Sequence, residues 1–179
     1  MEAAIMKLLY ENDGLICGIC NGFQALLKLG LVPFGKILEE TTVSPTLTFN
    51  LSGKHQSSLV KTKVVSNSSP WLMDFNAGDE FLVAVSHGEG RFVADDQTIG
   101  SLNAKGQIAT VYVDEQGDPG TAFPFNPNGS FGAIEGLLSP DGRVFGRMAH
   151  SERFISEVYR NVPGSKKMDI FTSGINYFR

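Results

Sequence analysis

Residues 15–27 read Leu-Ile-Cys-Gly-Ile-Cys-Asn-Gly-Phe-Gln-Ala-Leu-Leu, an apolar run that leads through Gly-x-Cys-x-Gly into a helical pattern. The apolar residues recur at helical spacing until Gly30 and Pro33, which are typical of a helix end. A strand that turns sharply into a helix exposes the turn residue beside backbone N–H groups and the positive end of the helix dipole. The stretch therefore predicts a nucleophile elbow with Cys20 at its turn, where the thiolate is favoured.

The cysteine motif also allows other interpretations. Gly18 and Gly22 flank Cys20 where a side chain is expected to collide with the turn, but a buried structural cysteine would fit as well. The Cys17-x-x-Cys20 spacing suggests a redox dithiol or half of a zinc site. If residues 15–19 form a strand, these two side chains point to opposite faces, and the chain has no histidines at ligand spacing. We therefore expect no metal site.

Composition limits the class of protein. The chain has 179 residues, 42% of them hydrophobic, so residues 1–179 can form a single domain with a substantial core. A net charge of −4 provides no basic footprint for nucleic acid. No apolar stretch approaches the roughly 18 residues of a membrane helix, and the first residues do not resemble a secretory signal. We expect a cytoplasmic protein that binds neither nucleic acid nor membrane.

The remaining pattern predicts strands joined by turns, after an N-terminal helix over residues 3–9 that ends at Asn-Asp-Gly. Residues 46–51 and 58–65 alternate in polarity and suggest a hairpin closed by residues 53–56. Residues 114–133 predict a long surface loop. Further strands are expected at residues 81–85, 108–113, 134–138 and 143–148, the last two joined by a Ser-Pro-Asp-Gly turn.

A cysteine nucleophile needs a base and a third group that orients the base. His150 and Glu152 are candidates, because residues two apart in an extended chain project to the same side. By itself a His-x-Glu pair is more often a solvated surface pair. The residues alone leave both interpretations open.

Taken together, these motifs resemble the class I glutamine amidotransferases, in which a cysteine in Gly-x-Cys-x-Gly acts with a later His-x-Glu. More narrowly, residues 86–92 (SHGEGRF), 125–130 (FNPNGS) and 134–153 (IEGLLSPDGRVFGRMAHSER) resemble the glutaminase domain of phosphoribosylformylglycinamidine synthase, an enzyme of purine biosynthesis. Several motifs in order are more specific than any one of them. The resemblance covers nearly the whole chain. It implies an α/β, doubly wound, flavodoxin-like class I glutamine amidotransferase fold with antiparallel strand additions.

The same resemblance implies roles for individual residues. Cys20 would attack the side-chain amide of glutamine, His150 would relay protons, and Glu152 would orient His150. The backbone N–H of Asn21 would donate to the oxyanion. His87, considered alone, could instead close a strand end with a local hydrogen bond. The implied substrate-binding residues are Asn21, Gln24, Ser86, His87 and Gly88.

The position of Cys20 departs from the family pattern, in which the nucleophile follows several βα units of roughly 30 residues or more. We therefore expect an N-terminally truncated domain, the C-terminal portion of a glutaminase, with little activity by itself. The resemblance implies glutamine as substrate and a synthetase domain or subunit as partner. No complete Gly-x-x-x-x-Gly-Lys-Ser/Thr motif is present, because Ile37 follows Lys36, so we expect no cofactor in this chain, with ATP and Mg²⁺ only in the partner.

Two other functions stay open. The same three residues could serve another cysteine amidohydrolase, whose labelling by a glutamine analogue would not be prevented by glutamine. The chain could also be a non-catalytic fragment that only docks on a synthetase, in which case replacing Cys20 would leave glutamine-dependent activity intact.

Overall fold

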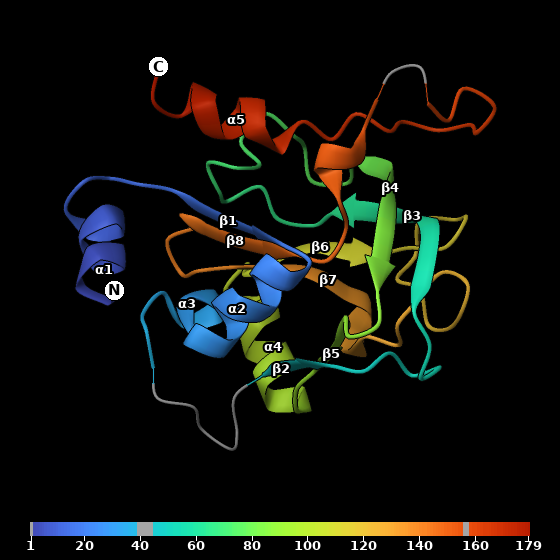
Figure 1. The fold of residues 1–179 in the computed structure, drawn as a ribbon, viewed down its shortest axis with the longest axis horizontal. Coiled ribbons are helices and arrows are strands. Elements are labelled where there is room, and N and C mark those ends of the chain that lie inside the picture. Colours follow the sequence, from blue (N-terminus) through green and yellow to red (C-terminus); the bar gives the residue numbers. More distant parts are fainter. Residues whose placement is uncertain (1, 39–44, 156–157) are drawn as a thin grey trace.

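A six-stranded mixed sheet forms the centre of the computed structural model, which describes residues 2–38, 45–155 and 158–179. The strand order is β1-β8-β7-β6-β3-β4 (Figure 1). β1 and β8 run parallel, and the other neighbouring pairs of this sheet are antiparallel. Its strands are β1 (Ile16–Ile19), β3 (Gln56–Val64), β4 (Glu80–His87), β6 (Ile108–Tyr112), β7 (Ile134–Leu138) and β8 (Val144–Arg147).

Helices flank the parallel pair. In Figure 1, α2 and α3 lie on one side of β1 and β8, and α5 lies on the other. This arrangement confirms the predicted α/β class with antiparallel additions. The helical segments are α1 (Glu2–Tyr10), α2 (Asn21–Leu29), α3 (Leu31–Phe34), α4 (Asp96–Ala104), α5 (Ile170–Asn176) and the 3₁₀ turns η1 (Phe131–Ala133) and η2 (Ser151–Arg153).

Glycines allow α2 to pack closely on the two parallel strands. A Cβ atom at Gly18 would lie 2.7 Å from the backbone of Gly22, and one at Gly146 would collide with the ring of Phe23. A Cβ atom at Gly22 would meet nothing within 4 Å, so the predicted collision there is wrong. Gly30 ends α2 in the left-handed conformation, as its position predicted.

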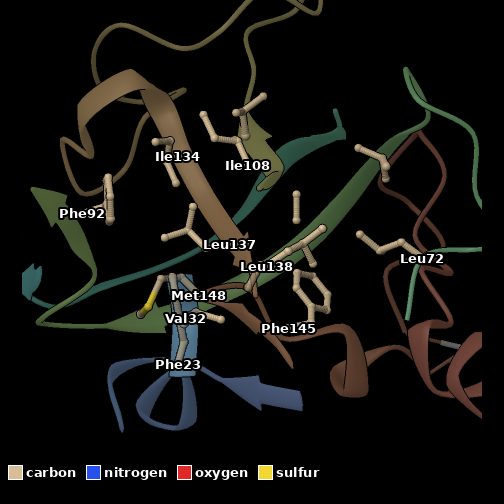
Figure 2. Close-up of a cluster of buried hydrophobic side chains, with 14 of the residues drawn as sticks. Phe23, Val32, Leu72, Phe92, Ile108, Ile134, Leu137, Leu138, Phe145 and Met148 are labelled. Carbon is tan, nitrogen blue, oxygen red and sulfur yellow. The ribbon is translucent and has the colours of Figure 1, made fainter. Parts of the chain in front are cut away.

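The core anchors the helix that follows the elbow. Phe23, the third residue of α2, is fully buried in the hydrophobic core (Figure 2). Leu137, Phe145 and Met148 are its companions in this cluster. Burying a phenylalanine contributes roughly 1.5–3 kcal/mol, so the start of α2 is held firmly against the sheet.

The predicted hairpin between residues 46–51 and 58–65 is wrong. β2 (Thr46–Thr48) pairs with β5 (Arg91–Val93) in a separate two-stranded sheet, whereas β3 pairs with β4 and β6. Alternating polarity marks a strand but does not specify its partner, which here lies farther along the chain. β4 is buried on alternate residues only, since its other face is partly exposed.

Two further segments differ from the sequence predictions. The surface loop predicted at residues 114–133 is wrong for its second half, because Asn126, Asn128 and Ser130 are buried. α4 was not predicted, although Asp95 accepts a hydrogen bond from the N–H of Thr98 as an N-cap residue does. The turn before β8 is confirmed by a hydrogen bond from the N–H of Gly142 to the carbonyl of Ser139.

The close contact at Gly146 leads to a stability prediction. Gly146→Ala should lower the free energy of unfolding by about 1–3 kcal/mol, because the added methyl group overpacks the ring of Phe23. Gly100→Ala is the matched control, since a Cβ atom there meets nothing within 4 Å in α4. That control should be neutral or stabilising by up to about 1 kcal/mol. Urea unfolding measures the stability of both variants. Equal unfolding midpoints for Gly146→Ala and Gly100→Ala would contradict the close packing of Phe23 on Gly146.

Candidate active site

Cys20 occupies a strained turn between β1 and α2. Its φ of 54° and ψ of −107° are rare for a non-glycine residue and cost about 1–3 kcal/mol. The N–H of Cys20 donates to the carbonyl of Arg147 at 2.8 Å, and its own carbonyl accepts from the N–H of Gln24 at 3.2 Å. The strand-to-helix turn predicted at Cys20 is therefore present, and it holds the thiol at the end of the parallel strand pair.

The surroundings of the thiol do not favour the thiolate. Burial raises the pKa of Cys20, while the N–H of Asn21 and the guanidinium of Arg153 lower it by less. Cys20 Sγ lies 3.7 Å from the carbonyl oxygen of Ser86. The expectation of a thiolate stabilised by the helix alone is wrong, because desolvation outweighs the helix N-terminus. A nucleophilic Cys20 consequently needs a base that takes its proton.

His150 and Glu152 lie just after β8 and contact each other. His150 Nδ1 and Glu152 Oε1 are 2.5 Å apart, and the backbone N–H of His150 donates to the carbonyl of Ala84 at 2.8 Å. With Nδ1 protonated against the carboxylate, the lone pair is on Nε2. This buried Nε2 has no hydrogen-bond partner among the described residues, Cys20 Sγ included. The pair can orient an imidazole that still has a free proton acceptor.

The loop after β4 lies against the elbow. Gln24 Nε2 donates to the carbonyl of Glu89, which joins the first turn of α2 to this loop. Ser86 directs its carbonyl toward Cys20 and its hydroxyl toward His55 Nε2, 3.0 Å away. Asn21 begins α2 with an exposed side chain. The structure thus brings Asn21, Gln24, the end of β4 with Ser86 and the following Gly88 to one place around Cys20; their contacts with substrate stay predictions.

His87 is part of a buried polar network. Its ring is 4% exposed, and Asn50 Oδ1 accepts from His87 Nδ1 at 3.1 Å and from the N–H of Gly90 at 3.2 Å. Asn128 Nδ2 donates to the carbonyl of Gly90 at 2.7 Å, and Ser130 Oγ donates to Asn128 Oδ1 at 2.7 Å. The network fixes the conformation of the loop over α2. The partner of His87 is Asn50, 37 residues away in the chain, so the structure does not contain the local hydrogen bond that the sequence suggested as an alternative.

Sequence reasoning missed a buried ion pair beside the site. Arg147 in β8 and Glu135 in β7 are both fully buried and contact each other through two nitrogen–oxygen pairs. A signal was available, because a charged residue inside an otherwise apolar strand requires a buried partner. The two predicted strands that carry these residues are adjacent in the sheet.

Comparison with known proteins assigns the family. Residues 1–178 match the family model of the CobB/CobQ-like glutamine amidotransferase domain. The chain belongs to this family. It is 33% identical to phosphoribosylformylglycinamidine synthase subunit PurQ of Treponema denticola, over 90% of this chain and 66% of that protein. For the PurQ subunit of Moorella thermoacetica the identity is 36%, over 80% of this chain and 55% of that protein.

A solved structure shares the fold. The structure of PurLQS from Thermotoga maritima matches with a TM-score of 0.69 and 31% identity, over 98% of this chain and 66% of that chain. The phosphoribosylformylglycinamidine synthase of Dictyostelium discoideum is 35% identical over 89% of this chain, which corresponds to 12% of that protein. These matches confirm the resemblance and the fold class of this glutamine amidotransferase domain. The chain spans about half to two thirds of the PurQ relatives.

Within residues 2–38, 45–155 and 158–179, no three His, Cys, Asp or Glu side chains form a group that could hold a metal ion. Both cysteines are free thiols. None of the helices in this part has the length and apolar character to cross a membrane.

The two cysteines should differ in reactivity. Burial raises the pKa of Cys17 to about 12, so roughly one thiol in ten thousand is ionised at pH 8. Cys20 is half-buried and should be the residue that iodoacetamide alkylates in the folded amidotransferase domain, faster as the pH rises toward the pKa of its thiol. Peptide mass spectrometry after short labelling reports both positions. Equal alkylation of Cys17 and Cys20 would contradict the strongly raised pKa of the Cys17 thiol.

The buried His87 should make stability depend on pH. Burial, with His55 as the second cause, lowers the pKa of His87 from 6.5 to about 4. His87 therefore binds a proton below about pH 6.5 in the unfolded chain but only below about pH 4 in the folded chain. The free energy of unfolding falls as the pH is lowered through this range. The total loss is about 3 kcal/mol. The free energy of unfolding, measured with urea between pH 7 and pH 4, should depend less steeply on pH in His87→Gln than in the wild-type protein. The same pH dependence in both proteins would refute the assignment of this effect to His87.

Proposed function

We propose that this chain carries the glutaminase activity of a phosphoribosylformylglycinamidine synthase. It would hydrolyse glutamine and supply ammonia for the ATP-dependent conversion of formylglycinamide ribonucleotide to formylglycinamidine ribonucleotide. Membership of the glutamine amidotransferase family and the names of the PurQ relatives support the proposal. The observation that carries it is Cys20 in a strained elbow, with a histidine after β8 whose Nδ1 meets Glu152.

In the first half of the reaction, Cys20 Sγ attacks the carboxamide carbon of glutamine and its proton passes to His150 Nε2. The oxygen of the tetrahedral intermediate becomes negative and accepts from the N–H of Asn21, the first residue of α2 after the nucleophile. One such donor contributes about 2.7–4 kcal/mol to the transition state. His150 then returns the proton to the leaving nitrogen. Ammonia departs and a glutamyl thioester remains on Cys20.

In the second half, His150 takes a proton from water, and the water oxygen attacks the thioester carbon. The carbon–sulfur bond then breaks, glutamate is released, and His150 returns the proton to Cys20 Sγ. Glu152 keeps the imidazole in one tautomer and orientation in both halves. We assign Gln24, Ser86 and Gly88 to the binding of glutamine, because Ser86 at the end of β4 contacts Cys20 and Glu89 just after the strand contacts Gln24. His87 holds this segment in place through Asn50.

In this proposal the ammonia is used by a synthetase domain or subunit. The similar structure from Thermotoga maritima is that of PurLQS, an assembly in which PurQ is a subunit, and this supports a partner of that kind. This chain has no Walker-type phosphate loop in its sequence, so we assign ATP and Mg²⁺ to the synthetase and no cofactor to the glutaminase.

The decisive test is Cys20→Ser in the enzyme assembled with its synthetase partner. We expect glutamine-dependent amidation to be lost and ammonia-dependent amidation to be kept, as measured by product formation with each nitrogen source. Cys17→Ala is the matched control and should keep both activities, since Cys17 lies within β1, before the turn that carries Cys20. Glutamine-dependent activity that survives in Cys20→Ser would refute the proposal. A glutamine-analogue electrophile that labels Cys20 despite excess glutamine would point to another amide substrate.

A further inference from the structure

The carboxylate of Glu135 is fully satisfied inside the protein. Oε1 accepts from Arg147 Nε at 3.2 Å and from the backbone N–H of Ala149 at 2.6 Å. Oε2 accepts from Arg147 Nη2 at 3.0 Å and from the hydroxyl of Thr110 at 2.5 Å. Desolvated charges are costly unless each is paired and hydrogen-bonded, and here a specific geometry satisfies both requirements.

The ion pair holds both neighbours of His150. On one side, Glu135 accepts from the N–H of Ala149; on the other, Arg147 Nη1 donates to Ser151 Oγ at 2.7 Å. His150 therefore lies between two residues that are tied to the same buried group. Its own N–H bonds to Ala84 of β4, so the backbone on either side of the imidazole has little freedom.

The backbone of Arg147 also reaches the nucleophile. Its carbonyl oxygen accepts from the N–H of Cys20 at 2.8 Å, at the point where β1 pairs with β8. One residue thus contacts the elbow through its main chain and the segment of the base through its side chain. The distance between the cysteine and histidine backbones consequently depends on where Arg147 is held.

Resting on the function proposed above, we infer that Arg147 and Glu135 are positioning residues of the glutaminase. Neither side chain touches the reacting atoms; together they set the place of His150 relative to Cys20. Packing alone does not account for a buried ion pair at this place, because two apolar side chains of similar volume would fill the same space between β7 and β8. Loss of the pair should release Ala149 and Ser151 and leave the imidazole less well aligned.

The main test replaces both charges at once. Glu135→Leu combined with Arg147→Met removes the ion pair without leaving one buried charge unpaired. In the assembled enzyme, kcat for glutamate release should fall roughly 10- to 100-fold, the loss expected for a displaced catalytic group, with little change in KM for glutamine. Ammonia-dependent amidation should be unchanged. Gln107→Leu is the control, since Gln107 is a buried anchor that bonds to Pro33 and Leu138 instead.

If the double variant does not fold, two single variants of Ser151 test the inference instead. Ser151→Ala removes the hydroxyl that Arg147 contacts and should lower kcat, whereas Ser151→Thr keeps the hydroxyl and should restore it. Wild-type kcat in a folded double variant or in Ser151→Ala overturns the inference. An equal fall in kcat for Gln107→Leu does so too, because the effect would then be general destabilisation. Failure of the function itself is a separate outcome, seen as glutamine-dependent activity in Cys20→Ser.

Discussion

The buried ion pair between Arg147 and Glu135 is the interaction on which the site depends. Removing one partner of such a pair typically costs about 3–5 kcal/mol, since the other charge stays buried without compensation. In this protein the pair links β6, β7 and β8 through Thr110, and it ties down the segment that carries His150. The sheet and the candidate base are therefore parts of one packed unit.

The nucleophile is held by a different constraint, the close approach of α2 to the parallel strands. Because Gly18 and Gly146 have no side chains, α2 can pack closely on the sheet. Phe23 anchors the first turn of α2 in the core. The strain at Cys20 is sustained by this packing. A third element, the polar network around His87, fixes the loop that faces the same turn. Three segments distant in sequence thus meet with little freedom at the ends of β1, β4 and β8.

Much of this arrangement was predictable from local patterns. The apolar run before Cys20, the helical spacing after it and the turn before β8 predicted a strand, a helix and a hairpin that the structure contains. The ordered motifs led to the right family, because several short matches at the right separations rarely coincide by chance. The predicted partner of residues 46–51 was wrong, and residues 126–130 were placed on the surface although their polar side chains are buried. Both errors concern long-range pairing, about which alternation and turn residues say nothing.

The sequence alone determined the elbow and the candidate base, since each is formed by residues that are close together in the chain. It also determined the family, since the motifs of that family occur in order along the chain. Tertiary structure decided the protonation of Cys20, because the pKa of its thiol depends on how deeply neighbouring segments bury it. It also decided the role of Arg147 and Glu135, two charges that look ordinary until β7 and β8 pair and exclude water from both. Desolvation depends on how the segments of the fold pack around a group, so its effect on this site follows from the tertiary structure and not from the sequence.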